Sequence, residues 1–224
     1  MIKQLPEKSN SQFMRDIFKR IFLLIPGHKK VYQYIMERIR DIKWRMDGKP
    51  VPDWHIKRQK ILHEFMEEYK IKTFVETGTY RGWMIDSMLP QVRKIYSIEL
   101  SRYWYLKAKL KYKNHHHVTL IHGDSGKELK QVIDKITEPC LFWLDGHYTD
   151  TTTAHGDTVT PILQELHHIL SRDLISNVII IDDAHEFSSN KNYPSIEKLR
   201  EYVRSYKRSA RFHKRENMII VEGI

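Results

Sequence analysis

The chain has 224 residues, of which 29% are charged, and a formal net charge of +10. This length suits one α/β domain with an extension. The single cysteine, Cys140, excludes an intramolecular disulfide framework, and we expect it to be a buried structural thiol of a cytoplasmic protein. No stretch reaches the roughly 20 apolar residues of a membrane-spanning helix. Charged residues also interrupt the N-terminus where a signal peptide would need an apolar run.

The basic surplus lies mainly in the first third of the chain, where residues 1–70 hold 16 Lys and Arg against 9 Asp and Glu. Residues 13–25 and 29–46 carry apolar side chains at helical spacing, and the stretch Gly48-Lys-Pro-Val-Pro52 then breaks the chain. We therefore divide the protein into a basic helical extension and a main domain. The predicted ranges of these two parts are 1–52 and 53–224.

Residues 13–46 predict helices with an apolar face that must be covered. Packing on the protein's own domain or on a second subunit, which would give a homo-oligomer, is the commoner use of such helices. Peripheral contact with a membrane is the alternative. Because the basic surplus lies outside the main domain, we expect no nucleic-acid partner.

From residue 71 onward, short apolar runs alternate with helical patterns. The expected strands are 72–76, 94–99, 118–122, 140–145 and 178–182. The expected helices are 54–69, 83–89, 101–112, one containing Leu129 to Ile136, 160–171 and 195–206. Two further strands, 210–214 and 218–221, are separated by a hairpin-length turn. This pattern predicts an α/β fold, with a Rossmann-like doubly wound sheet of seven strands that ends in an antiparallel hairpin.

The most informative stretch runs from Thr73 to Gly82. An apolar run ends at the carboxylate of Glu76, a turn containing Gly78 and Gly82 follows, and a helical pattern then begins. Glycine tolerates positive φ and lets a ligand approach the backbone, and a helix N-terminus offers free N–H groups. Glu99 ends the next strand about 20 residues later, where an acid commonly holds ribose hydroxyls. We therefore predict a site for an adenosine-containing cofactor.

Acidic residues follow one expected strand after another, and the carboxyl ends of the strands form the ligand-binding edge of such sheets. A single aspartate at such a position often only caps a helix or makes a turn, but a series is harder to explain in that way. The series consists of Glu76, Glu99, Asp124, Asp145, Asp182 and Asp183.

Over residues 71–224 this ordered set resembles the class I S-adenosylmethionine-dependent methyltransferases. The resemblance implies a glycine loop that passes the methionine part of the cofactor, an acid on the ribose and an Asp facing the adenine edge. The loop has the pattern ExGxxxG, which counts against the GxGxxG of NAD enzymes. The implied cofactor-binding residues are Glu76, Gly78, Thr79, Tyr80, Gly82, Glu99, Asp124, Ser125 and Asp145.

A narrower resemblance is to the metal-dependent sugar O-methyltransferases of macrolide and aminocoumarin pathways. It implies that Asp145, Asp182 and Asp183 hold Mg²⁺ or another divalent cation, which acidifies an acceptor hydroxyl. The sequence departs from this family at Asp145-Gly-His147-Tyr148, where those enzymes often have a further acid. The candidate catalytic residues here are Asp145 and His147, with His147 as the general base, although His147 could equally be a metal ligand or make a structural hydrogen bond. His185 is ambiguous in the same way, and imidazoles beside carboxylates leave Mn²⁺, Fe²⁺ or Zn²⁺ open.

The leading hypothesis is therefore an O-methyltransferase that acts on a hydroxyl of a sugar, glycan or natural product. The alternatives are a metal-independent methyltransferase and a degenerate scaffold that binds a membrane or partner through its basic N-terminus. Residues 149–159 are expected to form a substrate loop or lid, and Glu165 and His168 are expected on the surface. Core packing, rather than base stacking, is expected of the aromatic residues Tyr80, Trp83, Tyr103, Trp104, Tyr105 and Trp143.

Overall fold

A computed structural model describes residues 53–145, 160–172 and 177–224, together with isolated positions between 35 and 48. The chain divides into two compact units, Met1–Val51 and Pro52–Ile224. Most of the predicted N-terminal helices lie outside the described residues, so the fold presented here is that of the second unit. No helix in the described ranges combines the length and the apolar character needed to cross a membrane.

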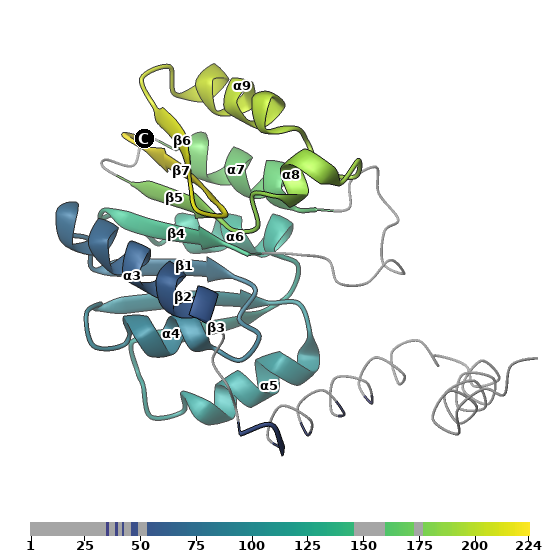
Figure 1. The fold of residues 1–224 in the computed structure, drawn as a ribbon. Coiled ribbons are helices and arrows are strands. Elements are labelled where there is room, and N and C mark those ends of the chain that lie inside the picture. The colour runs from purple at the N-terminus through teal and green to yellow at the C-terminus, as the bar shows by residue number, and fades with distance from the viewer. Residues whose placement is uncertain are drawn as a thin grey trace, which may run out of the picture. The chain divides into compact units, whose positions relative to one another are not determined.

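Seven strands form one sheet in the order β3-β2-β1-β4-β5-β7-β6 (Figure 1). The neighbouring pairs among β1 to β5 are parallel, whereas β7 runs antiparallel to both β5 and β6. The strand order reverses between β1 and β4, which is the switch point of a doubly wound sheet. The strands are β1 Thr73–Thr77, β2 Lys94–Glu99, β3 Val118–His122, β4 Cys140–Leu144, β5 Val178–Ile181, β6 Arg211–Arg215 and β7 Met218–Glu222. The predicted fold class is confirmed.

One helix, α3, precedes the first strand, and the others lie between strands where the periodicity predicted helices. One short helix, α8, was not predicted, because four residues are too few to show a helical repeat. The described helices are α3 Asp53–Glu68, α4 Trp83–Met88, α5 Arg102–Lys111, α6 Ser125–Ile133, α7 Ile162–Leu170, α8 Glu186–Ser189 and α9 Ile196–Tyr206.

Two hydrophobic clusters cover the two faces of the sheet. Phe74 packs into a cluster with side chains of α3, α4 and α5, whereas the next residue, Val75, packs with α6, α7 and α9. This alternation follows from the two-residue period of a strand. In Figure 1, α3 crosses the face of the sheet that is nearer to the viewer. Cys140 is fully buried in the second cluster, as expected.

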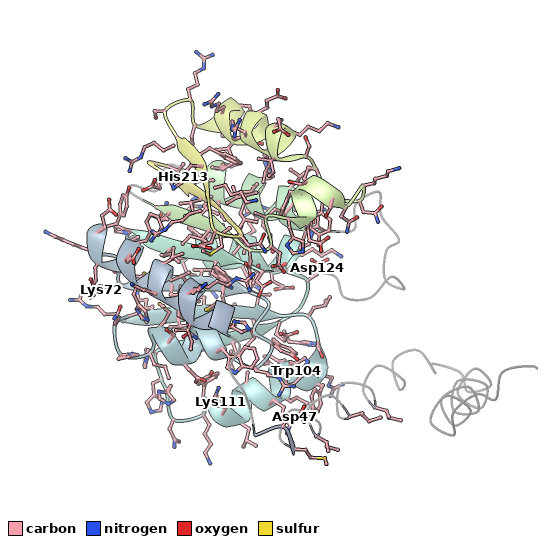
Figure 2. All side chains as sticks on the ribbon, in the orientation of Figure 1. Asp47, Lys72, Trp104, Lys111, Asp124 and His213 are labelled. Atoms are coloured by element: carbon pink, nitrogen blue, oxygen red, sulfur yellow. The ribbon has the colours of Figure 1, made fainter. Side chains whose placement is uncertain are left out.

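The carboxyl ends of the parallel strands all lie along one side of the sheet, which we call its carboxyl edge, and the acidic residues lie at this edge. In Figure 2, Asp124, which follows β3, lies on the side of the sheet opposite Lys72, which precedes β1. The amino-terminal and carboxyl-terminal edges of the sheet are thus clearly separated, and the functional residues have to be sought at the second.

Candidate functional site

The glycine loop connects β1 to α4 through three residues with positive φ. Gly78 has φ 87°, Tyr80 47° and Gly82 73°. A Cβ atom on Gly78 would lie 2.5 Å from the carbonyl oxygen of Asp145, and one on Gly82 would collide with the hydroxyl of Tyr112. Glycine is therefore required here by close contacts within the protein as well as by backbone conformation.

Glu99, at the end of β2, is held in place by backbone amides. Its Oε2 accepts a hydrogen bond from the N–H of Tyr80, and its Oε1 accepts one from the N–H of Ser101, both at 2.7 Å. The residue is 7% exposed. The Tyr80 contact joins the end of β2 to the glycine loop, and the two contacts together orient the carboxylate that the sequence assigns to the ribose hydroxyls.

Glu76, on β1, lies at the same edge but is more deeply buried, with 1% of its surface exposed. The Ser97 hydroxyl donates to its Oε1 at 2.6 Å, and the Thr79 hydroxyl lies 2.5 Å from the Ser97 oxygen. Burial raises the pKa of the Glu76 carboxyl well above its usual value; the Ser97 hydrogen bond opposes this, and the charges of Asp145 and Glu99 add to it. The acids at this edge of the sheet therefore cannot all be ionised easily.

At the end of β3, Asp124 acts as the N-cap of α6, where its Oδ1 accepts from the N–H of Gly126 at 2.9 Å. The next residue, Ser125, is 8% exposed. The structural role that such aspartates often have is therefore present at Asp124. A contact between Asp124 and the adenine edge stays a prediction.

The aromatic residues beside this loop do not all belong to the core. Trp143, Trp104 and Tyr103 are buried as expected, but Tyr80 is 42% exposed. The Tyr80 ring lies 4.6 Å from that of Trp104, and the Arg81 guanidinium carbon lies 5.1 Å from both ring centroids. Tyr80 belongs to the loop between β1 and α4 and packs on one side only, against Trp104 and Arg81, so the prediction of core packing is wrong for this residue.

A cluster of three carboxylates forms where β4 and β5 end. One carboxylate oxygen from each of Asp145, Asp182 and Asp183 lies within 4.8 Å of the others. Asp182 is 1% exposed, and Asp183 has φ 50°, an uncommon conformation for a non-glycine residue. The predicted metal ligands therefore meet, and their oxygen donors are the kind that hard divalent cations prefer.

Arg58 contacts this cluster from α3, the helix that precedes β1. Its Nη2 lies 2.6 Å from Asp182 Oδ1 and 2.7 Å from Asp183 Oδ1, and the residue is 7% exposed. Arg58 was not among the residues predicted from the sequence. A signal was present, because Arg58 shares a helical stripe with the buried residues Leu62 and Phe65, and an arginine on such a stripe requires a buried partner.

His55 lies one turn before Arg58 on α3 and was also missed. It is 8% exposed, and its ring centroid lies 4.2 Å from that of Trp83 in an edge-on contact. Burial lowers the pKa of His55 to about 4, with the Arg58 charge acting in the same direction and Asp183 opposing it. This imidazole is therefore neutral at physiological pH.

Asn217, in the turn between β6 and β7, connects the cluster to His185. Its Nδ2 donates to Asp183 Oδ1 at 3.1 Å and to His185 Nδ1 at 2.9 Å. Because Nδ1 accepts, the neutral imidazole carries its proton on Nε2. A cavity of about 370 Å³ lies beside these groups. Its lining residues are Lys57, Arg58, Ile61, Asp183, Glu216, Asn217 and Met218.

Two predicted features lie outside the described residues, namely His147 and the loop 149–159. Glu165, on α7, was expected on the surface but is 1% exposed, because it lies on the buried face of α7 with Ile162, Leu166 and Ile169. His168 is partly buried, and its Nε2 lies 2.8 Å from the carbonyl oxygen of Gly126, so α7 and α6 are joined at this point.

No known protein-family profile and no curated protein sequence matches this chain. Several solved structures are similar to it. An O-methyltransferase from Bacillus cereus, solved in complex with SAH, has a TM-score of 0.57 and 15% identity, covering 90% of this chain and 93% of its own. TomG from Streptomyces achromogenes is an O-methyltransferase involved in tomaymycin synthesis and was solved with SAM. It has a TM-score of 0.53 and 14% identity, and the match covers 75% of this chain and 79% of TomG.

A third similar structure is an S-adenosylmethionine-dependent methyltransferase from Clostridium acetobutylicum, with a TM-score of 0.53 and 9% identity, covering 84% of this chain and 98% of its own. At such identities the likeness concerns the path of the backbone. It agrees with the strand order and with the antiparallel β7. The chain therefore has the fold of the class I S-adenosylmethionine-dependent methyltransferases.

Proposed function

We propose that this protein is an S-adenosylmethionine-dependent O-methyltransferase that methylates a hydroxyl group of a sugar, glycan or natural product. The observation that supports this most strongly is the position of the acids. Glu76 and Glu99 lie on one side of the switch point and Asp145 and Asp182 on the other, all at the carboxyl edge of the sheet. Ligands of open α/β sheets bind at this place.

The electrostatics of the edge favour a cationic cofactor. The Glu76 carboxyl is already difficult to ionise because of burial and of its acidic neighbours Asp145 and Glu99. A ligand with a sulfonium and an ammonium group would relieve this repulsion, whereas the pyrophosphate of NAD would increase it. Glu76 and the glycine loop would hold the methionine part, and Glu99 the ribose. When bound, the cofactor supplies an already activated methyl group.

The acceptor side of the proposed site is the carboxylate cluster together with the neighbouring cavity, which Asp183 lines. A volume of about 370 Å³ is within the range of small-molecule sites, and the side chain of Asp183 is 25% exposed. Asp145, Asp182 and Asp183 would hold a divalent cation, whose contribution would be to lower the pKa of a hydroxyl bound beside it. The Asn217 amide orients Asp183 at the rim of this cavity.

Deprotonation of the acceptor needs a base near the cluster. We assign it to His147, whose ordinary pKa lies near neutrality. Among the described histidines, His55 is a poor base because its pKa is about 4. His185 is not assigned as the base, because its Nδ1 already accepts a hydrogen bond from Asn217. We assign it instead to positioning the β6–β7 turn.

A metal-independent methyltransferase is the second candidate, and Arg58 is the observation that favours it. The guanidinium already contacts two of the three carboxylates at 2.6 and 2.7 Å. A protein with its own cation at this place can hold Asp182 and Asp183 without an added ion. Methyl transfer that persists in excess chelator would select this candidate over the metal-assisted one.

Isothermal titration with S-adenosylhomocysteine, with and without Mg²⁺, tests the proposal. We expect micromolar binding in both conditions, and methyl transfer to a panel of hydroxylated acceptors that depends on the added cation. Absence of binding in both conditions, together with stabilisation by NADH in a thermal melt, would refute the methyltransferase assignment.

A further inference from the structure

We propose that Arg58 is a built-in competitor for the divalent cation and thereby sets the metal affinity of the carboxylate cluster. The inference rests on the proposed metal site and goes beyond it, because it names a residue outside the ligand set that controls how tightly the ion is held. Its consequence is that the wild-type protein binds a divalent cation more weakly than its three carboxylates would bind it alone.

The Arg58 guanidinium occupies a position between two of the candidate metal ligands. One guanidinium nitrogen, Nη2, bridges the two adjacent carboxylates, at 2.6 Å from Asp182 Oδ1 and 2.7 Å from Asp183 Oδ1. These are the short distances of charge-assisted hydrogen bonds. Both carboxylates belong to the candidate ligand set. An incoming cation must therefore share these side chains with the guanidinium or displace it.

Burial strengthens the interaction between Arg58 and these carboxylates. Arg58 is 7% exposed and Asp182 is 1% exposed, so water screens their interaction poorly. A guanidinium remains protonated at any physiological pH and cannot leave by losing its proton. A divalent cation placed beside the same carboxylates would feel its positive charge directly, and like charges at such distances repel strongly in a protein interior.

Arg58 also has a role in the metal-free protein. Three carboxylate oxygens within 4.8 Å repel one another when no cation is bound. Arg58 offsets this repulsion in the metal-free protein, and α3 is anchored on the sheet by the buried Leu62 and Phe65. The same charge that keeps the metal-free cluster folded thus competes with the ion.

The test is titration of the full chain with Mn²⁺, followed by the EPR signal of the free ion. The variants are Arg58→Met, Arg58→Gln, which keeps a neutral amide donor, and Arg58→Lys, which keeps the charge. We expect the two neutral variants to bind Mn²⁺ at least about 10-fold more tightly than wild type, the effect of removing one nearby charge. Arg58→Lys should stay close to wild type.

Arg215→Met is the matched control. Arg215 also contacts a carboxylate of α3, Glu64, at 2.5 Å, but both side chains are 42% exposed, so water screens this pair, and Glu64 is not one of the candidate metal ligands. This variant should bind Mn²⁺ as wild type does. A neutral Arg58 variant that binds Mn²⁺ equally well or more weakly would overturn the inference.

Loss of Arg58 should also lower the melting temperature, so thermal melts with and without Mg²⁺ give a second measurement. Mg²⁺ should stabilise Arg58→Gln more than wild type, because the ion replaces the missing charge and because tighter binding stabilises the folded state more at a given ion concentration. An equal Mg²⁺ effect would contradict the inference.

Failure of this inference can be told apart from failure of the proposed function. Absence of Mn²⁺ binding in all variants would overturn both the inference and the metal-assisted mechanism. S-adenosylhomocysteine binding, measured on the same samples, would still report on the cofactor assignment.

Discussion

Glu76 and Asp182 are equally buried, each with 1% of its surface exposed, and both lie at the carboxyl edge of the same sheet. Their surroundings differ. Asp182 faces the Arg58 guanidinium at 2.6 Å. Glu76 faces a serine hydroxyl and the charges of three other acids, and within the described ranges no cationic side chain pairs with it. Burial alone therefore does not decide whether a carboxylate stabilises the fold.

The difference separates the edge into two regions. In the cofactor region, around Glu76 and Glu99, burial and neighbouring acids disfavour the ionised form of Glu76, and a cationic ligand would stabilise that form. The cluster region, around Asp182 and Asp183, carries a cation of its own. We therefore expect ligand binding to stabilise the first region strongly, and the second only to the extent that an ion outcompetes Arg58.

Gly78 lies where the two regions meet, and Gly78→Ala should have the largest effect. The new Cβ would lie 2.5 Å from the Asp145 carbonyl oxygen, at a residue with φ 87°. Backbone strain of about 1–3 kcal/mol and a forced backbone shift of about 1–3 kcal/mol together predict a loss of about 4 kcal/mol in the free energy of unfolding. Urea denaturation measures this loss.

Gly223→Ala is the control for that substitution. Gly223 has a similar φ of 74°, but nothing lies within 4 Å of its added Cβ. It should cost only the conformational term, about 1–2 kcal/mol. Equal losses at the two positions would mean that the contact between the cofactor loop and Asp145 does not constrain either region.

Asp182→Ala tests the cluster region and should cost about 3 kcal/mol, since it removes one partner of a buried ion pair. The value lies at the lower end of the range for such changes because Asp183 still contacts Arg58. The control is Glu64→Ala, which breaks the exposed pair with Arg215 and should cost less than about 1 kcal/mol. Comparable losses in urea denaturation would show that the buried pair is no more important than a surface pair.

Glu99→Ala tests the cofactor region through binding. The substitution removes the acceptor for the N–H groups of Tyr80 and Ser101 together with the proposed ribose contact. One lost charge-assisted hydrogen bond of about 2 kcal/mol corresponds to roughly 30-fold weaker S-adenosylhomocysteine binding. Titration calorimetry measures this change. Mn²⁺ binding should be unchanged, and a parallel loss of Mn²⁺ affinity would contradict the division into two regions.

The sequence predicted that Glu76 and Glu99 lie at one edge of the sheet because the strands that carry them are close in the chain. The apolar runs of β1 and β2 end at Glu76 and Glu99, and parallel strands place their carboxyl ends at one edge. Sequence spacing alone was therefore enough to bring the acids together. The same reasoning placed Asp145 beside the Asp182–Asp183 pair, since β4 and β5 are neighbours in the sheet.

What the sequence did not predict depends on contacts between distant segments. Arg58 and Asp183 are separated by 125 positions, and no periodicity within α3 names the partner of a buried arginine. The requirement for glycine at position 82 comes from Tyr112, which belongs to another segment. Glu165 was placed on the surface because residue type was weighed above its position on the apolar face of α7. In each case local pattern specified the element, and tertiary packing specified the contact.

Glu76→Gln should have the smallest effect on stability, and the opposite sign. It removes a charge that burial and the neighbouring acids disfavour. We expect the melting temperature of the cofactor-free protein to rise at pH 8 by about 2–4 °C, which is the shift that about 1 kcal/mol produces in a domain of this size. Binding of S-adenosylhomocysteine should weaken in the same variant, because the Glu76 carboxylate is proposed to contact the methionine part of the ligand.

The pH dependence of this stabilisation separates charge from packing. The pKa of Glu76 is raised in the folded state, so its unfavourable contribution is absent at low pH, where the carboxyl is protonated in both states. It appears as the pH rises above the unfolded value of about 4.5 and is complete above the folded pKa. Melting temperatures of the two proteins should therefore coincide near pH 4 and diverge towards pH 8. A constant difference would mean that packing, and not the charge, distinguishes Glu76 from Asp182.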